Sequence, residues 1–285
     1  MKIGCIFCAL LLLYSNSSLD VRASIMPVYD SIGQSYSKFR LPDPRIVDLL
    51  VNLLQLEQGS LVADIGAGTG NYSRALADRG YFLYAVEPSS VMRSQATEHP
   101  QVQWFTGYAE DIPLPTSSVD AVICILATHH FSNLEKAVRE MNRAVKTGAI
   151  IFLTFDPRVG EKLWIADYFP EPWEDAFRVF PPLSDVVALI QANTQRTVEI
   201  FPLMLPHDLT DMFFAAGWRR PEIYLNPDIR AGISALALVD TNVVEKGVTL
   251  LEEDLNSGRW DAKYGEIRNL TEIDAGYRFL CARVA

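Results

Sequence analysis

Apolar residues between positions 43 and 156 follow two patterns that alternate along the chain. In one pattern they recur every three or four residues, which predicts amphipathic helices, and in the other they form short continuous runs, which predict buried strands. The predicted strands are Leu61 to Ile65, Tyr81 to Val86, Val102 to Phe105, Val119 to Leu126 and Ala149 to Thr154. The predicted helices begin after Asp43 and Pro44, after the glycine-rich loop, at Ser89 and near position 133. This alternation predicts parallel strands, right-handed crossovers and helices on both faces of the sheet.

Capping signals set the expected ends of these helices. Gly80 suits the position just after a helix that ends at Arg79. The next helix is expected over Ser89 to Glu98. Ser132 and Glu135 have the spacing of a capping box. We therefore expect Ser132 to cap a helix over 133–146.

The regular alternation ends after Asp156, where an aromatic and proline-rich segment begins. We interpret residues 157–182 as an inserted flap, whose aromatic side chains either fill a core or line a pocket for an apolar molecule. The pattern then predicts a helix at Ser184 to Asn193, a strand at Thr197 to Leu203, a mostly helical insertion over about 207–270 and a last strand at Gly276 to Val284. Together these elements predict one α/β domain over 26–285, with its core at about 43–156.

Composition narrows the class of ligand. The chain has 285 residues, of which 49% are apolar, and a formal net charge of −10. A net negative field repels phosphate backbones, so nucleic acid is not an expected partner. The four cysteines, Cys5, Cys8, Cys124 and Cys281, do not have metal-ligand spacing, and we expect no metal site. Oligomeric state is not readable from these features.

The glycine-rich loop follows the first predicted strand and contains Gly66, Gly68 and Gly70. The dinucleotide pattern G-x-G-x-x-G would require a glycine at position 71, where the chain has Asn71. A nucleotide P-loop would require a lysine directly after its last glycine, and Asn71 occupies that position also. The loop therefore resembles both motifs but matches neither.

Two carboxylates beside the loop favour a cationic nucleoside ligand. Asp64 lies two residues before Gly66, where it would repel a pyrophosphate and attract a cation. S-adenosylmethionine carries an ammonium and a sulfonium and no phosphate, so its amino-acid part suits this loop, whose amides can bind the carboxylate. Glu87 ends the second strand and can accept both ribose hydroxyls.

These motifs, with three later ones, resemble the class I S-adenosylmethionine-dependent methyltransferases of the type 11 group, which includes ubiquinone and menaquinone biosynthesis enzymes. The later motifs are Tyr-Ala-Glu-Asp-Ile-Pro-Leu-Pro at 108–115, the segment at 119–131 that ends in Thr-His-His-Phe, and Glu-Met-Asn-Arg-Ala-Val-Lys-Thr-Gly at 140–148. The resemblance runs from about Tyr29 to Asp156. It implies a Rossmann-like fold with a seven-stranded, mostly parallel sheet, helices on both faces and helical lid insertions.

The resemblance also implies the cofactor contacts. It places the methionine part at Asp64, Gly66, Ala67 and Gly68, the ribose at Glu87 and Pro88, and the adenine near Ala109, Glu110 and Asp111. Many relatives have aspartate where this chain has Tyr108, which leaves open whether Glu110 or Asp111 binds the adenine amino group. Tyr29 and Tyr36 belong to a segment that folds over the cofactor in this group, and they either contact it or anchor a terminal helix.

His129 and His130 follow the fourth strand, at the edge where a parallel sheet binds ligands. One imidazole either serves as a general base or hydrogen-bond donor to the substrate, or the pair only shapes the pocket. The Asn/Asp-Pro-Pro-aromatic signature of base- and glutamine-N-methyltransferases does not occur here, since the chain reads Ala-Thr-His-His. We therefore expect a small-molecule acceptor.

Residues 1–25 form an apolar leader with two interpretations. Lys2, the run Ile3 to Leu13 and the small-residue site Val21 to Ala23 fit a signal peptide. The run is too short to span a membrane as a helix. Met26 precedes the first segment with the pattern of folded protein, so the leader is alternatively an upstream extension. We favour the extension and a cytoplasmic location, because S-adenosylmethionine is made in the cytosol; export is the alternative.

The sequence thus predicts an S-adenosylmethionine-dependent methyltransferase. A nicotinamide-dependent oxidoreductase is an alternative that both Asn71 and Asp64 disfavour. A non-catalytic S-adenosylmethionine-binding protein is another, because a glycine loop reports binding and not chemistry. The residues do not indicate which atom of the acceptor takes the methyl group.

Overall fold

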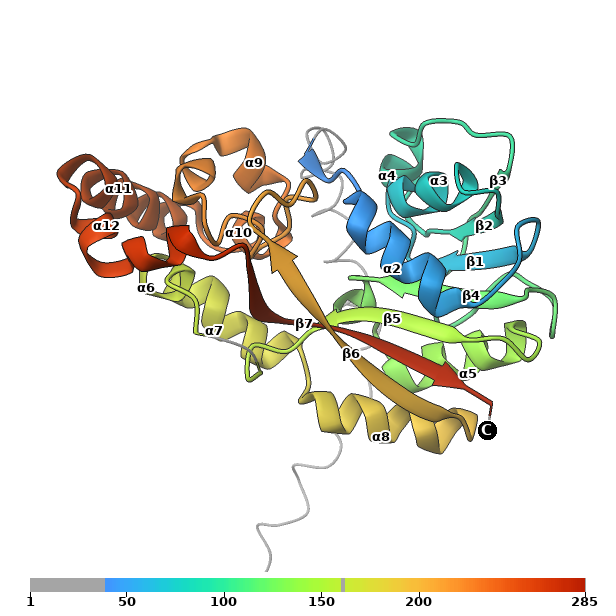
Figure 1. Cartoon of the computed structure of the whole chain (residues 1–285). Coiled ribbons are helices and arrows are strands. Elements are labelled where there is room, and N and C mark those ends of the chain that lie inside the picture. Colours follow the sequence, from blue (N-terminus) through green and yellow to red (C-terminus); the bar gives the residue numbers. More distant parts are fainter. Residues whose placement is uncertain (1–38, 160–161, 285) are drawn as a thin grey trace, which may run out of the picture.

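The computed structural model describes residues 39–159 and 162–284 (Figure 1). The apolar leader at 1–25 and the two tyrosines expected to contact the cofactor, Tyr29 and Tyr36, lie outside the described residues. Interpretations of those positions therefore stay predictions.

Seven strands of the described chain form one sheet in the order β3-β2-β1-β4-β5-β7-β6. They are β1 (Leu61–Ile65), β2 (Phe82–Val86), β3 (Val102–Phe105), β4 (Ala121–Ile125), β5 (Ile150–Phe155), β6 (Thr197–Pro206) and β7 (Glu272–Arg283). The first five strands are parallel, and β7 is antiparallel to both β5 and β6. The predicted mostly parallel α/β sheet is confirmed. Strand order reverses between β1 and β4, and such a switch point is where open α/β sheets bind ligands.

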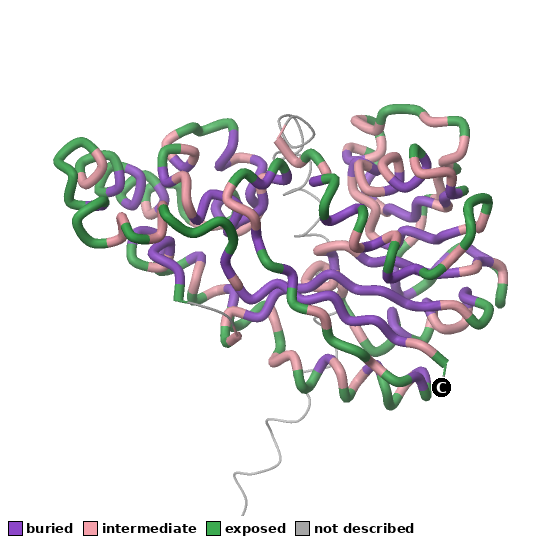
Figure 2. Tube along the Cα trace, in the orientation of Figure 1, coloured by how far each residue is buried: buried purple, intermediate pink, exposed green. Residues whose placement is uncertain are grey.

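Helices cover both faces of the sheet, as predicted. On one face α2 (Pro44–Leu54) and α3 (Asn71–Ala77) lie over the sheet, and on the other lie α5 (Leu134–Ala144) and α8 (Leu183–Thr194). Neighbouring strand residues point to opposite faces, so Val62 joins the core cluster under α2 whereas Ala63 joins the cluster under α5. Figure 2 shows the buried residues concentrated in the strands between these layers.

Three predicted helix ends are wrong. The helix after the glycine loop ends at Ala77 and not at Arg79, although Gly80 has the expected positive φ of 94°. The helix expected over Ser89 to Glu98 is the short α4 (Ser90–Ser94), which Ser89 caps. The cap of α5 is Asn133, whose side chain accepts from the backbone of Lys136.

The aromatic segment and the later insertion form a helical block beside the sheet (Figure 1). Its elements are α6 (Ile165–Tyr168), α7 (Pro170–Val179), η2 (Pro221–Leu225), α9 (Pro227–Ala231), α10 (Ser234–Ala237), α11 (Thr241–Ser257), α12 (Arg259–Tyr264) and η3 (Gly265–Asn269). Trp164 lies at its centre, with ring centroids 5.6 Å from Tyr224 and 5.4 Å from Trp260. The indole of Trp164 donates to the Trp218 carbonyl at 2.6 Å. These aromatic side chains fill the core of the block, one of the two roles considered for the flap.

Candidate active site

The glycine-rich loop joins β1 to α3 in a conformation that requires its glycines. Gly66, Gly68 and Gly70 have φ values of 75°, 59° and 74°, which side chains with a Cβ rarely adopt. A Cβ at Gly66 would approach that of Ala127 to 2.7 Å, and one at Gly70 would meet the Trp104 ring at 2.5 Å. The loop is therefore pressed against its neighbours, and its amides face the carboxyl ends of the strands.

Glu87 follows β2 and its carboxylate is tied to the loop. It accepts from the Gly68 amide at 3.0 Å and from the Ser89 amide at 2.9 Å. The residue is 8% exposed. Burial raises the pKa of Glu87, while the two amide bonds oppose that rise. The carboxylate is thereby held in one position with lone pairs left for a ligand hydroxyl.

Asp64 lies behind the loop. Its side chain accepts from the Ser73 hydroxyl at 2.6 Å and is 2% exposed. Burial raises the pKa of Asp64 to about 7, the bond from Ser73 opposes the rise and the charge of Glu87 adds to it. Asp64 is not among the residues that line the pocket described next.

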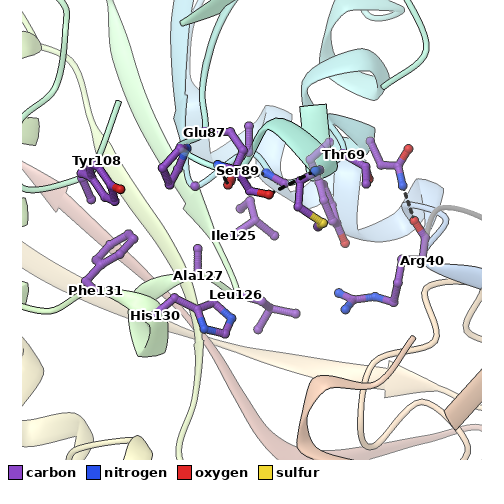
Figure 3. Close-up of a pocket in the computed structure, with 18 of the residues that line it drawn as sticks. Arg40, Thr69, Glu87, Ser89, Tyr108, Ile125, Leu126, Ala127, His130 and Phe131 are labelled. Carbon is purple, nitrogen blue, oxygen red and sulfur yellow. Dashed lines mark hydrogen bonds between the residues drawn. The ribbon is translucent and has the colours of Figure 1, made fainter. Parts of the chain in front are cut away.

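A pocket lies at the carboxyl edge of the sheet (Figure 3). Eight of the predicted site residues line it: Gly66, Ala67, Gly68, Glu87, Pro88, Ala109, Glu110 and His130. Three others, Asp64, Asp111 and His129, are not among its lining residues. The wall also contains residues that sequence reasoning missed: Arg40, Thr69, Asn71, Tyr72, Ser89, Met92, Tyr108, Ile125, Leu126, Ala127, Phe131, Ser132 and Asp211.

One end of the pocket is mostly apolar. In Figure 3, Tyr108 and Phe131 lie at this end, with Glu87 between them and the opposite end. Glu110 belongs to the same wall and is 4% exposed. Its carboxylate accepts from the Ser132 hydroxyl at 2.7 Å and from the Asn133 amide at 3.0 Å. Ser132, predicted as a helix cap, instead holds Glu110.

The opposite end carries an ion pair that joins distant parts of the chain. Arg40 donates through Nε to Asp211 at 2.6 Å, and the Tyr72 hydroxyl donates to the same carboxylate at 2.9 Å. Asn71 donates to the Arg40 carbonyl at 2.6 Å. Asp211 is 1% exposed, so the pair is desolvated. Asn71 and Tyr72 directly follow the glycine loop, which could have flagged them, whereas no motif surrounds Asp211.

The two histidines lie at the end of β4 in the 3-10 turn η1 (Thr128–His130). Their ring centroids are 3.7 Å apart, and the ring of His129 is 4.9 Å from that of Phe180. Burial, and to a smaller extent the charge of Arg40, lower the pKa of His130 to about 4. The pKa of His129 is also depressed, by burial first and then by His130 and Arg40. Both imidazoles are therefore neutral at physiological pH.

The described residues were also searched for metal-binding groups and for membrane-spanning helices. Among residues 39–159 and 162–284, no group of three or more His, Cys, Asp or Glu side chains could hold a metal ion. In the same ranges, no helix combines the length and apolar character needed to cross a membrane.

Comparisons with known proteins agree with this geometry. A family model for the methyltransferase domain matches residues 63–153. An uncharacterised methyltransferase of Mycobacterium tuberculosis is 31% identical over 189 residues, which cover 64% of this chain and 74% of that protein. The chain belongs to the type 11 S-adenosylmethionine-dependent methyltransferases.

Two further proteins are similar to this methyltransferase. A crystal structure from Anabaena variabilis, described as a methyltransferase from an antibiotic biosynthesis pathway, is 58% identical with a TM-score of 0.85, covering 86% of this chain and 99% of that one. The ubiquinone/menaquinone biosynthesis C-methyltransferase of Rubrivivax gelatinosus is 27% identical over 166 residues, covering 50% of this chain and 65% of that enzyme. The chain spans 50% to 65% of the length of the first curated relatives it matches.

Proposed function

We propose that this methyltransferase transfers a methyl group from S-adenosylmethionine to a small-molecule acceptor. The observation that carries the proposal is the pocket, which holds the Glu87 carboxylate near an apolar end and the Arg40 guanidinium at the other end. A ligand that fits must present hydroxyls to the carboxylate, an anion to the guanidinium and a flat apolar group to the aromatic side chains. S-adenosylmethionine has an adenine, a ribose and an amino-acid carboxylate in this order along its length.

The apolar end suits the adenine. Tyr108 and Phe131 offer aromatic faces there, and Ala109 leaves room beside them. Of the two candidates for the adenine amino group, Glu110 lines the pocket whereas Asp111 is exposed on the outer side of the turn. Glu110 is therefore the better-supported partner.

The polar end suits the amino-acid part. The Arg40 guanidinium would pair with the carboxylate, because a charge-assisted bond is stronger than a bond from loop amides alone. Asp64 would favour the ammonium and sulfonium charges through the loop. Tyr29 and Tyr36 remain further predicted contacts.

When bound, the cofactor supplies a methyl group on a positively charged sulfur, which makes the carbon electrophilic. The chain's own contribution is to align the acceptor and exclude water, and effective molarity from alignment alone lowers barriers by roughly 7 to 11 kcal/mol. Arg40 and Asp211 both line the pocket and form an ion pair, which supports this role.

Calorimetry with the full chain tests the proposal. S-adenosylhomocysteine should bind, NADH should not, and Glu87→Ala should weaken S-adenosylhomocysteine binding by about tenfold because hydrogen bonds to a charged group are lost. Glu57→Ala is the control, since Glu57 is exposed in the turn before β1 at the opposite edge of the sheet. Binding of NADH in place of S-adenosylhomocysteine would favour an oxidoreductase. Binding without methyl transfer to any acceptor would favour a non-catalytic protein.

The acceptor is proposed as a small molecule with an apolar portion. The pocket wall beyond the glycine loop includes Ile125, Leu126 and Ala127. The net charge of −10 disfavours nucleic acid. The relative from Anabaena variabilis, described as part of an antibiotic biosynthesis pathway, supports a metabolite rather than a macromolecule.

A further inference from the structure

The segment between β3 and β4 that lines the proposed adenine end forms only turns and isolated bridges. Tyr108, Ala109 and Glu110 from this segment line the pocket. The Asp111 amide donates to the Tyr108 carbonyl at 3.1 Å, which closes a single tight turn. The other backbone groups of such a segment need partners elsewhere in the molecule. The position of Glu110 therefore depends on what holds the segment from outside.

Two side chains of α5 bind the backbone of this segment at three points. The Glu140 carboxylate accepts from the Ile112 amide at 3.1 Å. The Arg143 guanidinium donates to the Ile112 carbonyl at 2.9 Å and to the Leu114 carbonyl at 2.8 Å. Arg143 also donates twice to Glu140, at 2.8 Å and 2.7 Å. The two side chains thus form a bidentate ion pair of fixed geometry, and both members hold the segment.

Packing extends this hold along the segment. Ile112 and Leu114 are 3% and 4% exposed and belong to the core cluster under α5. Pro113 lies between them and packs against Gly107, where an added Cβ would approach the proline ring to 2.4 Å. The segment is therefore held both before and after Glu110.

The start of α5 holds the Glu110 side chain itself. The Glu110 carboxylate accepts from the Ser132 hydroxyl and the Asn133 amide. Glu140 and Arg143 lie roughly two to three turns further along the same helix. Neither of them lines the pocket, so they would act on a ligand only through the segment that carries Glu110.

We propose that Glu140 and Arg143 are positioning residues, which hold the segment 107–114 so that Glu110 selects adenine among the purine bases. This inference rests on the proposed binding of S-adenosylmethionine, with Glu110 as the partner of the adenine amino group. That amino group donates hydrogen bonds, whereas hypoxanthine has at the same position a carbonyl oxygen, which a carboxylate repels. A carboxylate that is held in place discriminates fully between the two bases. A carboxylate on a loosened segment can turn away from the oxygen and discriminates less.

Calorimetry with two cofactor analogues tests the proposal. S-inosylhomocysteine carries a carbonyl in place of the amino group of S-adenosylhomocysteine. The wild-type chain should bind S-adenosylhomocysteine at least about tenfold more tightly, the size of one hydrogen bond to a charged group. Glu110→Gln should bring this ratio close to one, because an amide can accept from the amino group or donate to the oxygen. Arg143→Ala should reduce the ratio to about threefold, because the segment loses two of its three bonds to α5.

Glu140→Gln is the milder variant. It keeps an acceptor for the Ile112 amide but removes the charge that pairs with Arg143, so the ratio should fall by a smaller factor. Arg139→Ala is the matched control, because Arg139 lies four residues before Arg143 on the same helix and binds Asn193 of α8 at 2.7 Å. It should keep the wild-type ratio. Thermal melting shows which variants fold, and Glu140→Gln carries the test if Arg143→Ala does not fold.

The possible outcomes separate the two proposals. If S-adenosylhomocysteine does not bind the wild-type chain, the proposed function fails. If it binds but is not favoured over S-inosylhomocysteine, Glu110 does not read the base and the positioning role is wrong. If the folded variants of Glu140 and Arg143 keep the wild-type ratio, or lose affinity for both ligands equally, the pair only stabilises the fold, while the methyltransferase function stands. A ratio that falls in these variants and not in Arg139→Ala supports the inference.

Discussion

The two ends of the pocket are built from the chain in different ways. The apolar end uses short stretches that follow β1, β2, β3 and β4, so its residues lie between positions 66 and 132. At the opposite end, Arg40 and Asp211 are 171 residues apart and form a 2.6 Å ion pair. The difference indicates that local motifs specify the apolar end, whereas long-range assembly completes the end that we propose for the amino-acid part of the cofactor.

Backbone contacts reinforce that assembly. Arg40 and Asp211 form an antiparallel bridge, and the Met212 amide donates to the Phe39 carbonyl at 3.0 Å. The Thr210 amide donates to the Asp43 carboxylate at 3.1 Å. The segment before α2 and the start of the insertion are thus joined side by side. A change in the insertion can therefore alter the Arg40 end of the pocket while the glycine loop stays intact.

The largest expected effect on ligand binding lies at the local end. Gly66→Ala would add a Cβ 2.7 Å from that of Ala127 at a φ of 75°, so the loop must shift. We expect the affinity for S-adenosylhomocysteine to fall by about a hundredfold, as for steric strain of roughly 3 kcal/mol. Calorimetry measures the change.

Gly59→Ala is the control for that substitution. Gly59 has a φ of 87° but no atom within 4 Å of an added Cβ. It should lose about 1 kcal/mol of stability through backbone strain and keep its affinity. Equal affinity losses in the two variants would mean that the loop's close contacts do not matter for binding.

At the long-range end, Asp211→Ala would leave the Arg40 charge and the Tyr72 hydroxyl without their shared partner. Breaking a buried ion pair costs about 3 to 5 kcal/mol, so the midpoint of urea unfolding should fall clearly. Asp208→Ala removes an exposed partner of Arg45, and it should cost no more than about 1 kcal/mol. Similar losses in both would show that the buried Arg40–Asp211 pair stabilises the fold no more than the exposed pair does.

A smaller effect on binding is expected from a conservative change at the Arg40 end. Arg40→Lys keeps the charge but loses the planar donor geometry, so S-adenosylhomocysteine should bind about tenfold more weakly. Methylthioadenosine, which has no amino-acid carboxylate, should bind the variant and the wild type alike. Equal losses for both ligands would contradict the assignment of Arg40 to the carboxylate.

The smallest effect concerns the buried acid behind the loop. The pKa of Asp64 is raised from 3.8 to about 7 in the folded state, so between these values the folded protein holds a proton that the unfolded chain has lost. The contribution of Asp64 to stability therefore falls as pH rises toward 7. Ser73→Ala removes the bond that lowers this pKa, so the fall should extend to higher pH. Urea unfolding across pH measures it, with the exposed Ser94→Ala as control; parallel pH curves for the two variants would refute the coupling.

Local pattern predicted much of the fold and the cofactor side. The apolar runs located all seven strands. The glycine loop and Glu87 could be predicted as pocket residues because backbone conformation and position at a strand end depend on neighbouring residues. The predicted cap of α5 was wrong because a tertiary contact engages Ser132. Glu110 takes the Ser132 hydroxyl, which leaves Asn133 as the cap.

The sequence by itself determined that the sheet is mostly parallel, that the glycine loop follows its first strand and that the Glu87 carboxylate follows its second. The five motifs determined the family. Only the tertiary structure decided that Asp64 lies behind the loop, that Arg40 and Asp211 meet at the pocket, and that His130 rather than His129 forms its wall. The physical reason is the distance along the chain over which each interaction acts. Periodicity and turn chemistry act over a few residues, whereas an ion pair between positions 40 and 211 exists only after the insertion has folded against the segment before α2.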